Sequence, residues 1–318
     1  MRSYLLRRVA FALFLIVAVS SASLILARLA PGDYADVVYG TNATPEQRAA
    51  YRHEHGLDKS IGAQYVDWIA HAVRLDFGTS LMYGQPVRDL IPQRAANTAI
   101  LAVTALVFAT VVGLALGVVT GSGRGGVVAN VIRSVSLVLL SMPPLLTSLF
   151  LVFVAARTGW LPIAGMHSAR IESGGAASAL DLVKHLIVPA AAIGLPLAAM
   201  FERLQSQAMR EVVSRPFVIA TLARGVPWTR VIWRDALKVA LGPVASVYGL
   251  VVGTLLSGSF AVEIITAWPG LGRLMLDALS SRDVFLVAGC AGAGATFLAI
   301  GTLCSDLALA WVDPRVRE

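Results

Sequence analysis

Charge is scarce in this chain, because Asp, Glu, Lys and Arg make up only 14% of its 318 residues and six long stretches contain none. The charge-free stretches are residues 9–27, 95–123, 134–156, 185–201, 239–262 and 284–305. Each is about as long as the 17 to 25 residues with which a helix crosses ~30 Å of hydrocarbon, or somewhat longer. Because hydrocarbon offers no partner to a backbone N–H, such segments must be helices. With a mean hydropathy of +0.73, the sequence predicts an all-α fold, a polytopic membrane bundle of six transmembrane helices.

Several sources of chemical activity are also missing from the sequence. It contains no G-x-x-x-x-G-K phosphate loop, so it has no such device for holding ATP. A proton- or sodium-coupled carrier needs an ionisable residue within the membrane. The six charge-free stretches contain no Asp, Glu, Lys or Arg for that role. Neither a nucleophile–base pair nor a metal-ligand cluster is evident, and no cofactor is expected. The sequence therefore indicates a non-enzymatic transport body driven by an external energy source.

Three smaller features are interpreted as structural rather than chemical. Cys290 and Cys304 are separated by about 21 Å along one helix, too far for a disulfide, and are expected to be packing residues. His53 and His55 face apart on a predicted helix and are expected to be surface histidines rather than metal ligands. The GSGRGG run at 121–126 matches a dinucleotide fingerprint, but it follows an apolar span instead of a strand, which predicts a turn.

The net charge of +7 is distributed so that it orients the chain in a membrane. If the N-terminus is cytoplasmic, the inside segments hold fourteen basic residues against six acidic ones, whereas the short outside loops hold five basic residues. This asymmetry follows the positive-inside rule. The sequence thus predicts cytoplasmic N- and C-termini, and its basic balance does not indicate nucleic acid as a partner.

The chain is expected to divide near residue 94. Residues 1–94 would contain the first transmembrane helix and an extracytoplasmic helical segment, and residues 95–318 a five-helix core. In the outer segment, Thr44 and Gln47 form a capping box that starts a helix running to about His55 and stopping at Gly56. A second amphipathic helix is predicted from Ile61 to Val73 by its apolar spacing.

Between the fourth and fifth charge-free stretches lies a basic, helix-forming segment, residues 202–238, expected to be broken at Pro216 and Gly225. Phe217, Ala220, Thr221 and Arg224 share one face at helical spacing, and Gly225 is placed to end the helix. Two interpretations are open. The helix lies at the lipid interface with snorkelling arginines, or it docks in a groove of a soluble partner, which its short apolar face favours.

This segment resembles the cytoplasmic loop of binding-protein-dependent ABC importer permeases. The family pattern is Glu-Ala-Ala, three residues, Gly, nine residues, then Ile-x-Leu-Pro. It maps here to Ile219, Ala220, Thr221, Gly225, Asp235, Leu237 and Lys238. The glutamate, the second alanine, the isoleucine and the proline of that pattern are absent from this chain.

Further motifs resemble the B-type permease subunit of dipeptide, oligopeptide and nickel importers, in the same order along nearly the whole chain. They are LAPGD (29–33), GLDKSIGAQYVDWI (56–69), DFGTSL (76–81), VEIITAWPGLGRLMLDAL (262–279), Arg282-Asp283 and DPRVR (313–317). The resemblance implies the type I ABC importer permease fold in a bacterial inner membrane. It also implies four kinds of partner: a C-type permease, two cytoplasmic ABC ATPases, an extracytoplasmic substrate-binding protein and the lipid bilayer.

The resemblance further implies the roles of particular residues. An ATPase-coupling surface would comprise Phe217, Ala220, Thr221, Arg224, Gly225, Asp235 and Leu237. An outer-mouth gate would comprise Trp268, Pro269, Gly270 and Gly272, although Trp268 is equally explained as an interfacial aromatic. The expected function is half of the translocation pathway of an ATP-driven importer of di- or oligopeptides, working by alternating access. The alternatives are a nickel-chelate or other small-solute importer and, in another class, an ATPase-independent channel or facilitator.

Overall fold

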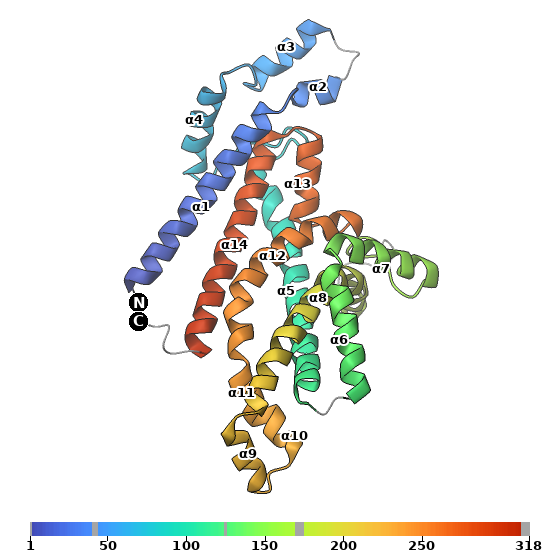
Figure 1. The fold of residues 1–318 in the computed structure, drawn as a ribbon. Helices are drawn as coiled ribbons and strands as arrows, with labels where there is room; N and C mark the ends of the chain where they lie inside the picture. The colour runs from blue at the N-terminus through green and yellow to red at the C-terminus, as the bar shows by residue number, and fades with distance from the viewer. Residues whose placement is uncertain (1, 40–43, 124–125, 169–174, 313–318) are drawn as a thin grey trace. The chain divides into compact units, whose positions relative to one another are not determined.

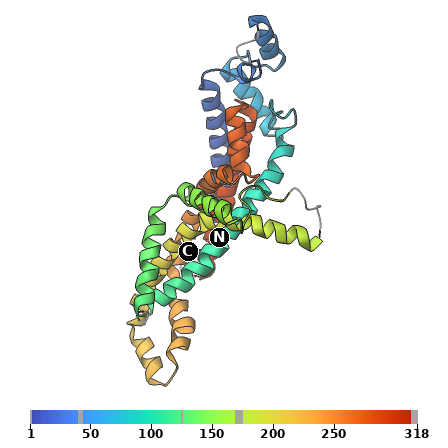
Figure 2. The same cartoon turned by 90° about the vertical axis from the view of Figure 1, so that its right-hand side faces the viewer.

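The computed structural model describes residues 2–39, 44–123, 126–168 and 175–312, and it is built from helices (Figures 1 and 2). The first helix is α1 (Arg2–Leu29). The outer segment contains α2 (Tyr34–Tyr39), α3 (Pro45–Glu54) and α4 (Ile61–Ala72). Then follow α5 (Val87–Gly121), α6 (Gly126–Ser141), α7 (Pro144–Thr158), α8 (Gly175–Val213) and α9 (Pro216–Ala223). The chain continues through α10 (Trp228–Arg230), the π-helix η1 (Val231–Ala236), α11 (Leu237–Ala240), α12 (Gly242–Ile265), α13 (Leu271–Ser280) and α14 (Val284–Val312).

Within the described ranges, four helices are long and apolar enough to cross a membrane, namely α1, α5, α8 and α14. Two bent pairs raise the number to six if each pair is one span. The pair α6 and α7 bends by 110° where the sequence predicts the third span. Pro143 and Pro144 lie at the break, and Pro143 has an extended backbone. Because proline lacks an N–H and disfavours the helical conformation of the residue before it, the helix ends there.

The capping predictions for the outer segment are confirmed. Thr44 caps α3 with both hydrogen bonds of the capping box, and Pro45 occupies the first helical position. Gly56, just beyond the end of α3, has a φ of +62°, a conformation that glycine adopts without steric cost. The second predicted helix is α4, and His55 stacks on Tyr51 with ring centroids 4.0 Å apart.

The turn predicted at 121–126 is also confirmed at its described ends, because α5 ends at Gly121 and α6 begins at Gly126. Cys290 is buried with a free thiol, as expected for a packing residue. The side chain of Cys304 and the DPRVR motif lie outside the described residues.

Contacts between Cα atoms divide the chain into two compact units. One unit comprises residues 1–98 and 269–300, and the other comprises residues 99–268 and 301–318. The first unit therefore joins the outer segment to a part of the chain that follows almost two hundred residues later. The expected boundary near residue 94 stays a prediction.

The fully buried Asp283 carboxylate links the two parts of the first unit through hydrogen bonds. Its Oδ2 accepts hydrogen bonds from the Ser80 hydroxyl at 2.6 Å and from the Met82 amide at 3.1 Å. Its Oδ1 accepts from the Leu286 amide at 3.1 Å and so caps the first turn of α14. Two of the sequence motifs, DFGTSL and Arg282-Asp283, thus meet through one side chain.

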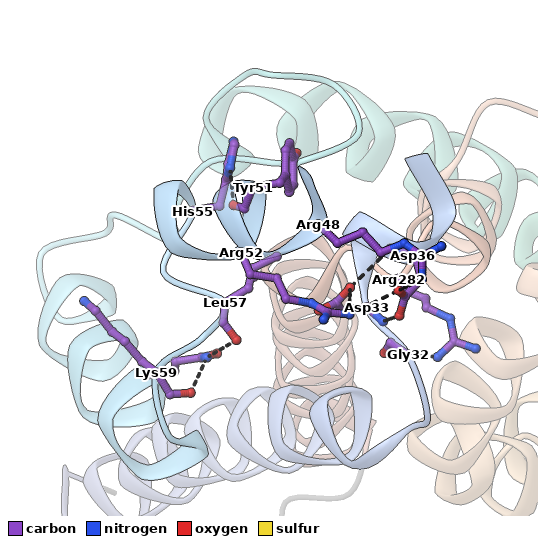
Figure 3. Close-up of polar contacts among 11 residues, drawn as sticks. Gly32, Asp33, Asp36, Arg48, Tyr51, Arg52, His55, Leu57, Lys59 and Arg282 are labelled. Atoms are coloured by element: carbon purple, nitrogen blue, oxygen red, sulfur yellow. Dashed lines mark hydrogen bonds and ion pairs between the residues drawn. The ribbon is translucent and has the colours of Figure 1, made fainter. Parts of the chain in front are cut away.

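A second polar cluster in the same unit holds the start of the outer segment (Figure 3). Arg52 on α3 donates from Nε to Asp33 at 2.7 Å and from Nη2 to Asp36 at 3.1 Å. Partial burial favours the neutral acid at Asp33, but the Arg52 hydrogen bond and charge outweigh it and lower the pKa of Asp33. Arg282 donates to the Gly32 carbonyl at 3.2 Å. The LAPGD motif is therefore tied to both α3 and the residue next to Asp283.

Asp283→Ala is expected to destabilise the first unit, because it leaves the Ser80 hydroxyl and the Leu286 amide buried without an acceptor. Each orphaned group costs about 1–3 kcal/mol. The measurement is the amount of monodisperse protein in detergent after a temperature ramp, which should fall well below that of the unmodified chain. Asp277→Ala is the matched control, since Asp277 is only part-buried and accepts one long bond from Tyr83 at 3.5 Å. Equal stability of the two variants would contradict the capping role of Asp283.

The second unit is organised around the close contact of α5 with α8. A Cβ atom added at Gly113 would lie 2.6 Å from the Ala198 carbonyl oxygen, and one at Gly117 would lie 2.5 Å from the Gln205 Cβ. One added at Gly121 would lie 2.5 Å from the Met209 Cβ. Gly113, Gly117 and Gly121 therefore form a close-packing stripe, of the small-xxx-small type found between membrane helices.

Candidate functional site

The segment at 202–238 begins as a direct continuation of α8, which runs to Val213 beyond the charge-free stretch. Arg215 then takes an extended conformation, φ −73° and ψ 147°, as expected for a residue before proline. Pro216 starts α9 at the first helical position, where its missing N–H costs nothing. The predicted break at Pro216 is confirmed.

The predicted break at Gly225 is confirmed as well. Gly225 has a φ of +84°, and its amide bonds the Leu222 carbonyl at 2.9 Å, while the Val226 amide reaches the Thr221 carbonyl at 3.4 Å. This left-handed residue ends α9 and satisfies its last carbonyls. Pro227 is then the N-cap residue of α10.

The chain returns toward α12 through α10, η1 and α11, which pack on the end of α8. Ile232 and Ala236 of η1 and Ala240 of α11 are buried in one cluster with Met209 and Val212 of α8. Leu237 packs against the same cluster. Because a π-helix turn is wider than an α-turn, η1 sets which residues face this cluster and which face outward. In Figure 1, α9, α10 and α11 form one small group at the end of α8.

Five of the seven residues predicted for the coupling surface line one shallow surface depression. Phe217, Ala220, Thr221 and Arg224 come from the α9 end, and Asp235 comes from η1. Thr221 donates to the Phe217 carbonyl at 2.8 Å, and Arg224 donates to the Thr221 hydroxyl at 3.2 Å. We refer to these five residues as the loop depression. Of the other two, Gly225 ends α9 beside it and Leu237 faces the cluster beneath.

Val218 shows how α9 is anchored with this face outward. It is buried to 1% exposure, whereas its neighbours Phe217 and Ile219 are 38% and 61% exposed. Val218 is therefore the fully buried side chain of α9, and the loop depression remains exposed in the isolated chain. Ala223 also lines the depression. The sequence reasoning missed it, although its spacing of three from Ala220 is a helical signal that could have found it.

The residues of the predicted outer gate occupy different surroundings. Trp268 is fully buried and belongs to the main apolar cluster of the second unit, with Phe201 and Leu255. An interfacial tryptophan facing lipid would be exposed, so its burial does not fit the aromatic-belt alternative. The Asn97 side chain donates from Nδ2 to the Pro269 carbonyl at 2.8 Å.

A short helix starts after the proline, and it is α13. Gly270 is its N-cap residue, Gly272 is buried in its first turn, and the Leu271 amide donates to the Thr98 hydroxyl at 2.8 Å. The division between the two compact units falls between Trp268 and Pro269. The four residues predicted as a gate thus include the point where the chain passes from one unit to the other.

Comparison with known proteins finds similarity along the full length of the chain. Residues 1–102 match the N-terminal family of binding-protein-dependent transport system membrane components, and residues 113–318 match the family described as binding-protein-dependent transport system inner membrane component. A di/tripeptide transport system permease protein, DppB of Pseudomonas aeruginosa, is 32% identical over 100% of this chain and 99% of its own length. An oligopeptide transport system permease protein, AppB of Bacillus subtilis, is 28% identical over the full length of both. The dipeptide permease DppB of Escherichia coli is 31% identical over 100% of this chain and 99% of its own length.

The fold and these matches define a helical, multi-pass membrane permease. The chain belongs to the family of inner membrane components of binding-protein-dependent transport systems, and it resembles that family's B-type peptide permeases. Such a permease is one subunit of an ABC importer complex, so other subunits complete the transporter.

Proposed function

We propose that this chain forms half of the translocation pathway of an ATP-driven importer of di- or oligopeptides. The observation that carries the proposal is the full-length similarity to permeases named for dipeptides, di/tripeptides and oligopeptides. The partners in this proposal are a C-type permease, two cytoplasmic ABC ATPases and an extracytoplasmic substrate-binding protein. The chain itself is not an enzyme here, since ATP is hydrolysed by the partner ATPases.

The proposed mechanism is alternating access between two packings of the helices, biased by the partners. The loop depression docks in a groove of one ATPase. When the ATPases close on ATP, α9 moves, and the movement passes to α8 because η1 and α11 are packed on the α8 end. The depression is open and has few apolar residues, and it carries one positive charge at Arg224 and one negative charge at Asp235. A surface of this composition suits contact with a protein groove better than contact with lipid.

Reconstitution with the partner subunits in proteoliposomes tests this function. We expect accumulation of a radiolabelled dipeptide that requires both ATP and the binding protein. Uptake of a nickel chelate in place of the peptide would assign the chain to the other branch of the family. Peptide entry that is unchanged without ATP would instead indicate a channel or facilitator and contradict the proposal.

The proposed orientation places both termini and α9 in the cytoplasm, with α3 and α4 outside. In a background in which Cys290 and Cys304 are replaced by Ser, Ala49→Cys on α3 should react with an impermeant maleimide on intact cells. Ser214→Cys, next to α9, should react only after the membrane is permeabilised. Both positions are exposed in the structure, so burial does not limit either reaction. Labelling of Ser214→Cys on intact cells would contradict the orientation and the coupling role of α9.

Gly225→Val is expected to weaken ATPase association and uptake by distorting the end of α9. The φ of +84° costs a β-branched residue ~1–2 kcal/mol, and no atom lies within 4 Å of an added Cβ, so the effect comes from the backbone alone. Gly225→Asn is the matched control, because asparagine tolerates this conformation. Co-purification of the ATPase and uptake in cells are the two measurements. If Val and Asn behave alike at 225, the left-handed turn does not matter for coupling.

A further inference from the structure

Three arginines gather in a cleft between α6 and α8, away from the loop depression. Arg133 belongs to α6, and Arg203 and Arg210 belong to α8. The two helices are neighbours in the second unit (Figure 1). The spacing of seven residues between Arg203 and Arg210 corresponds to two helical turns, so both lie on one side of α8.

The positive charge of this cleft is not neutralised by the protein. Glu202 is the carboxylate in the cleft lining, but it is only 2% exposed and accepts a hydrogen bond from the Thr120 hydroxyl at 2.5 Å. Arg203 makes no hydrogen bond or ion pair to any residue that the structure describes, and Arg210 makes one long bond to the Ser206 hydroxyl, at 3.4 Å. Three guanidinium groups therefore face one engaged carboxylate.

Two nitrogens of the Arg133 guanidinium group donate hydrogen bonds within the protein, and the third has no acceptor among the described atoms. Its Nη2 donates to the Thr120 carbonyl at 2.5 Å and its Nη1 to Asn130 Oδ1 at 3.3 Å. Its Nε is buried and has no partner among the described atoms. A buried donor without an acceptor is costly, so a ligand oxygen reaching this atom would be favoured.

The same cleft has an apolar wall formed by exposed leucines of α6. Leu137 and Leu140 of α6 line the cleft one and two turns beyond Arg133, and they are 55% and 36% exposed. In a membrane protein, a helix face of this kind contacts acyl chains. The cleft thus presents cations at one end and an acyl-compatible wall at the other.

We propose that this cleft binds one anionic phospholipid, with its phosphate at Arg133, Arg203 and Arg210 and an acyl chain along Leu137 and Leu140. A zwitterionic lipid carries its own cation next to the phosphate and gains less from three arginines. Basic pockets between membrane helices bind anionic head groups in this way. The lipid would clamp α6 to the part of α8 that continues into α9.

Native mass spectrometry of the purified permease complex tests the proposal. Phosphatidylglycerol and phosphatidylcholine are titrated separately, and the retained lipid is counted. Arg203→Gln should weaken phosphatidylglycerol binding about fivefold, the effect of losing one surface arginine, without disturbing a hydrogen bond of the fold. Adding Arg210→Gln should weaken it about fivefold again. Phosphatidylcholine binding should not change in either variant.

The matched control is Arg230→Gln with Arg234→Gln, which removes two exposed charges outside the cleft lining. Equal loss of phosphatidylglycerol in the control would show that net charge alone recruits the lipid and would overturn the site. Displacement of the lipid by glycerol phosphate at equal concentration would indicate a free-anion site instead. Protection of Gln207→Cys from maleimide in the complex with phosphatidylcholine alone would show that a protein subunit covers the cleft, which also overturns the proposal.

Discussion

Ala220→Phe is expected to reduce uptake by about fivefold to a hundredfold while the permease remains folded and inserted. Ala220 is exposed in the loop depression, so a larger side chain meets solvent in the isolated chain and leaves its stability unchanged. In a closely packed groove the added ring overpacks the interface, at a cost of about 1–3 kcal/mol. Because 1.4 kcal/mol is a tenfold change in affinity, ATPase association should fall by about fivefold to a hundredfold.

The measurements for Ala220→Phe are the amount of ATPase that co-purifies with the complex and dipeptide uptake at equal permease levels. Ala49→Phe makes the same change on exposed α3 and should leave ATPase binding intact. An α9 that lies on lipid predicts the opposite result, because more apolar area would hold it to the membrane at least as well. Normal uptake by an assembled Ala220→Phe complex would therefore refute docking and favour the interfacial helix.

Gly117→Ala is expected to disrupt the second unit even though it adds a single methyl group. The added Cβ would lie 2.5 Å from the Gln205 Cβ and 2.8 Å from the Glu202 carbonyl oxygen. These neighbours belong to the α8 backbone or are fixed to it, so α5 and α8 must move apart. Overpacking of this kind costs about 1–3 kcal/mol at one site, and here it also separates the helices along the glycine stripe.

The measurement for Gly117→Ala is the midpoint of heat-induced aggregation in detergent, together with the level of protein in the membrane. Gly242→Ala is the control in the same unit, since nothing lies within 4 Å of its added Cβ. Alanine has a better helix propensity than glycine by up to ~1 kcal/mol, so this control should be unchanged or slightly more stable. If both alanines prove equally tolerated, α5 and α8 do not pack as closely as the structure indicates.

Local sequence signals predicted those features that depend on a few neighbouring residues. The capping box at Thr44 and the helix ends at Gly56 and Gly225 follow from hydrogen bonds and φ angles within one turn. The helical membrane class followed from the charge-free stretches, because a lipid environment leaves the backbone few alternatives. The 110° bend at Pro143 and Pro144 lies within a predicted span, and its angle does not follow from the sequence, since neighbouring helices set such an angle.

The roles of the predicted site residues remain proposals, and the structure contributes their arrangement. The sequence placed Phe217, Ala220 and Arg224 on one face because they are close along one helix. Asp235 was assigned to the same surface through the family resemblance alone, because its place beside α9 depends on how η1 and α11 pack on α8. The burial of Trp268 likewise follows from contacts with residues of α8 and α12.

By itself, the sequence determined the membrane class of this protein, its helix ends and the family whose motifs it carries. Only the tertiary structure decided which distant residues meet. The Asp283 carboxylate joins Ser80 across two hundred residues, and Arg133 of α6 reaches the Thr120 carbonyl of α5. A helix end is fixed by atoms within one turn, so composition and spacing reveal it. A buried carboxylate or an unneutralised group of arginines is defined by its partners in space, and a single sequence does not encode their proximity in any local pattern.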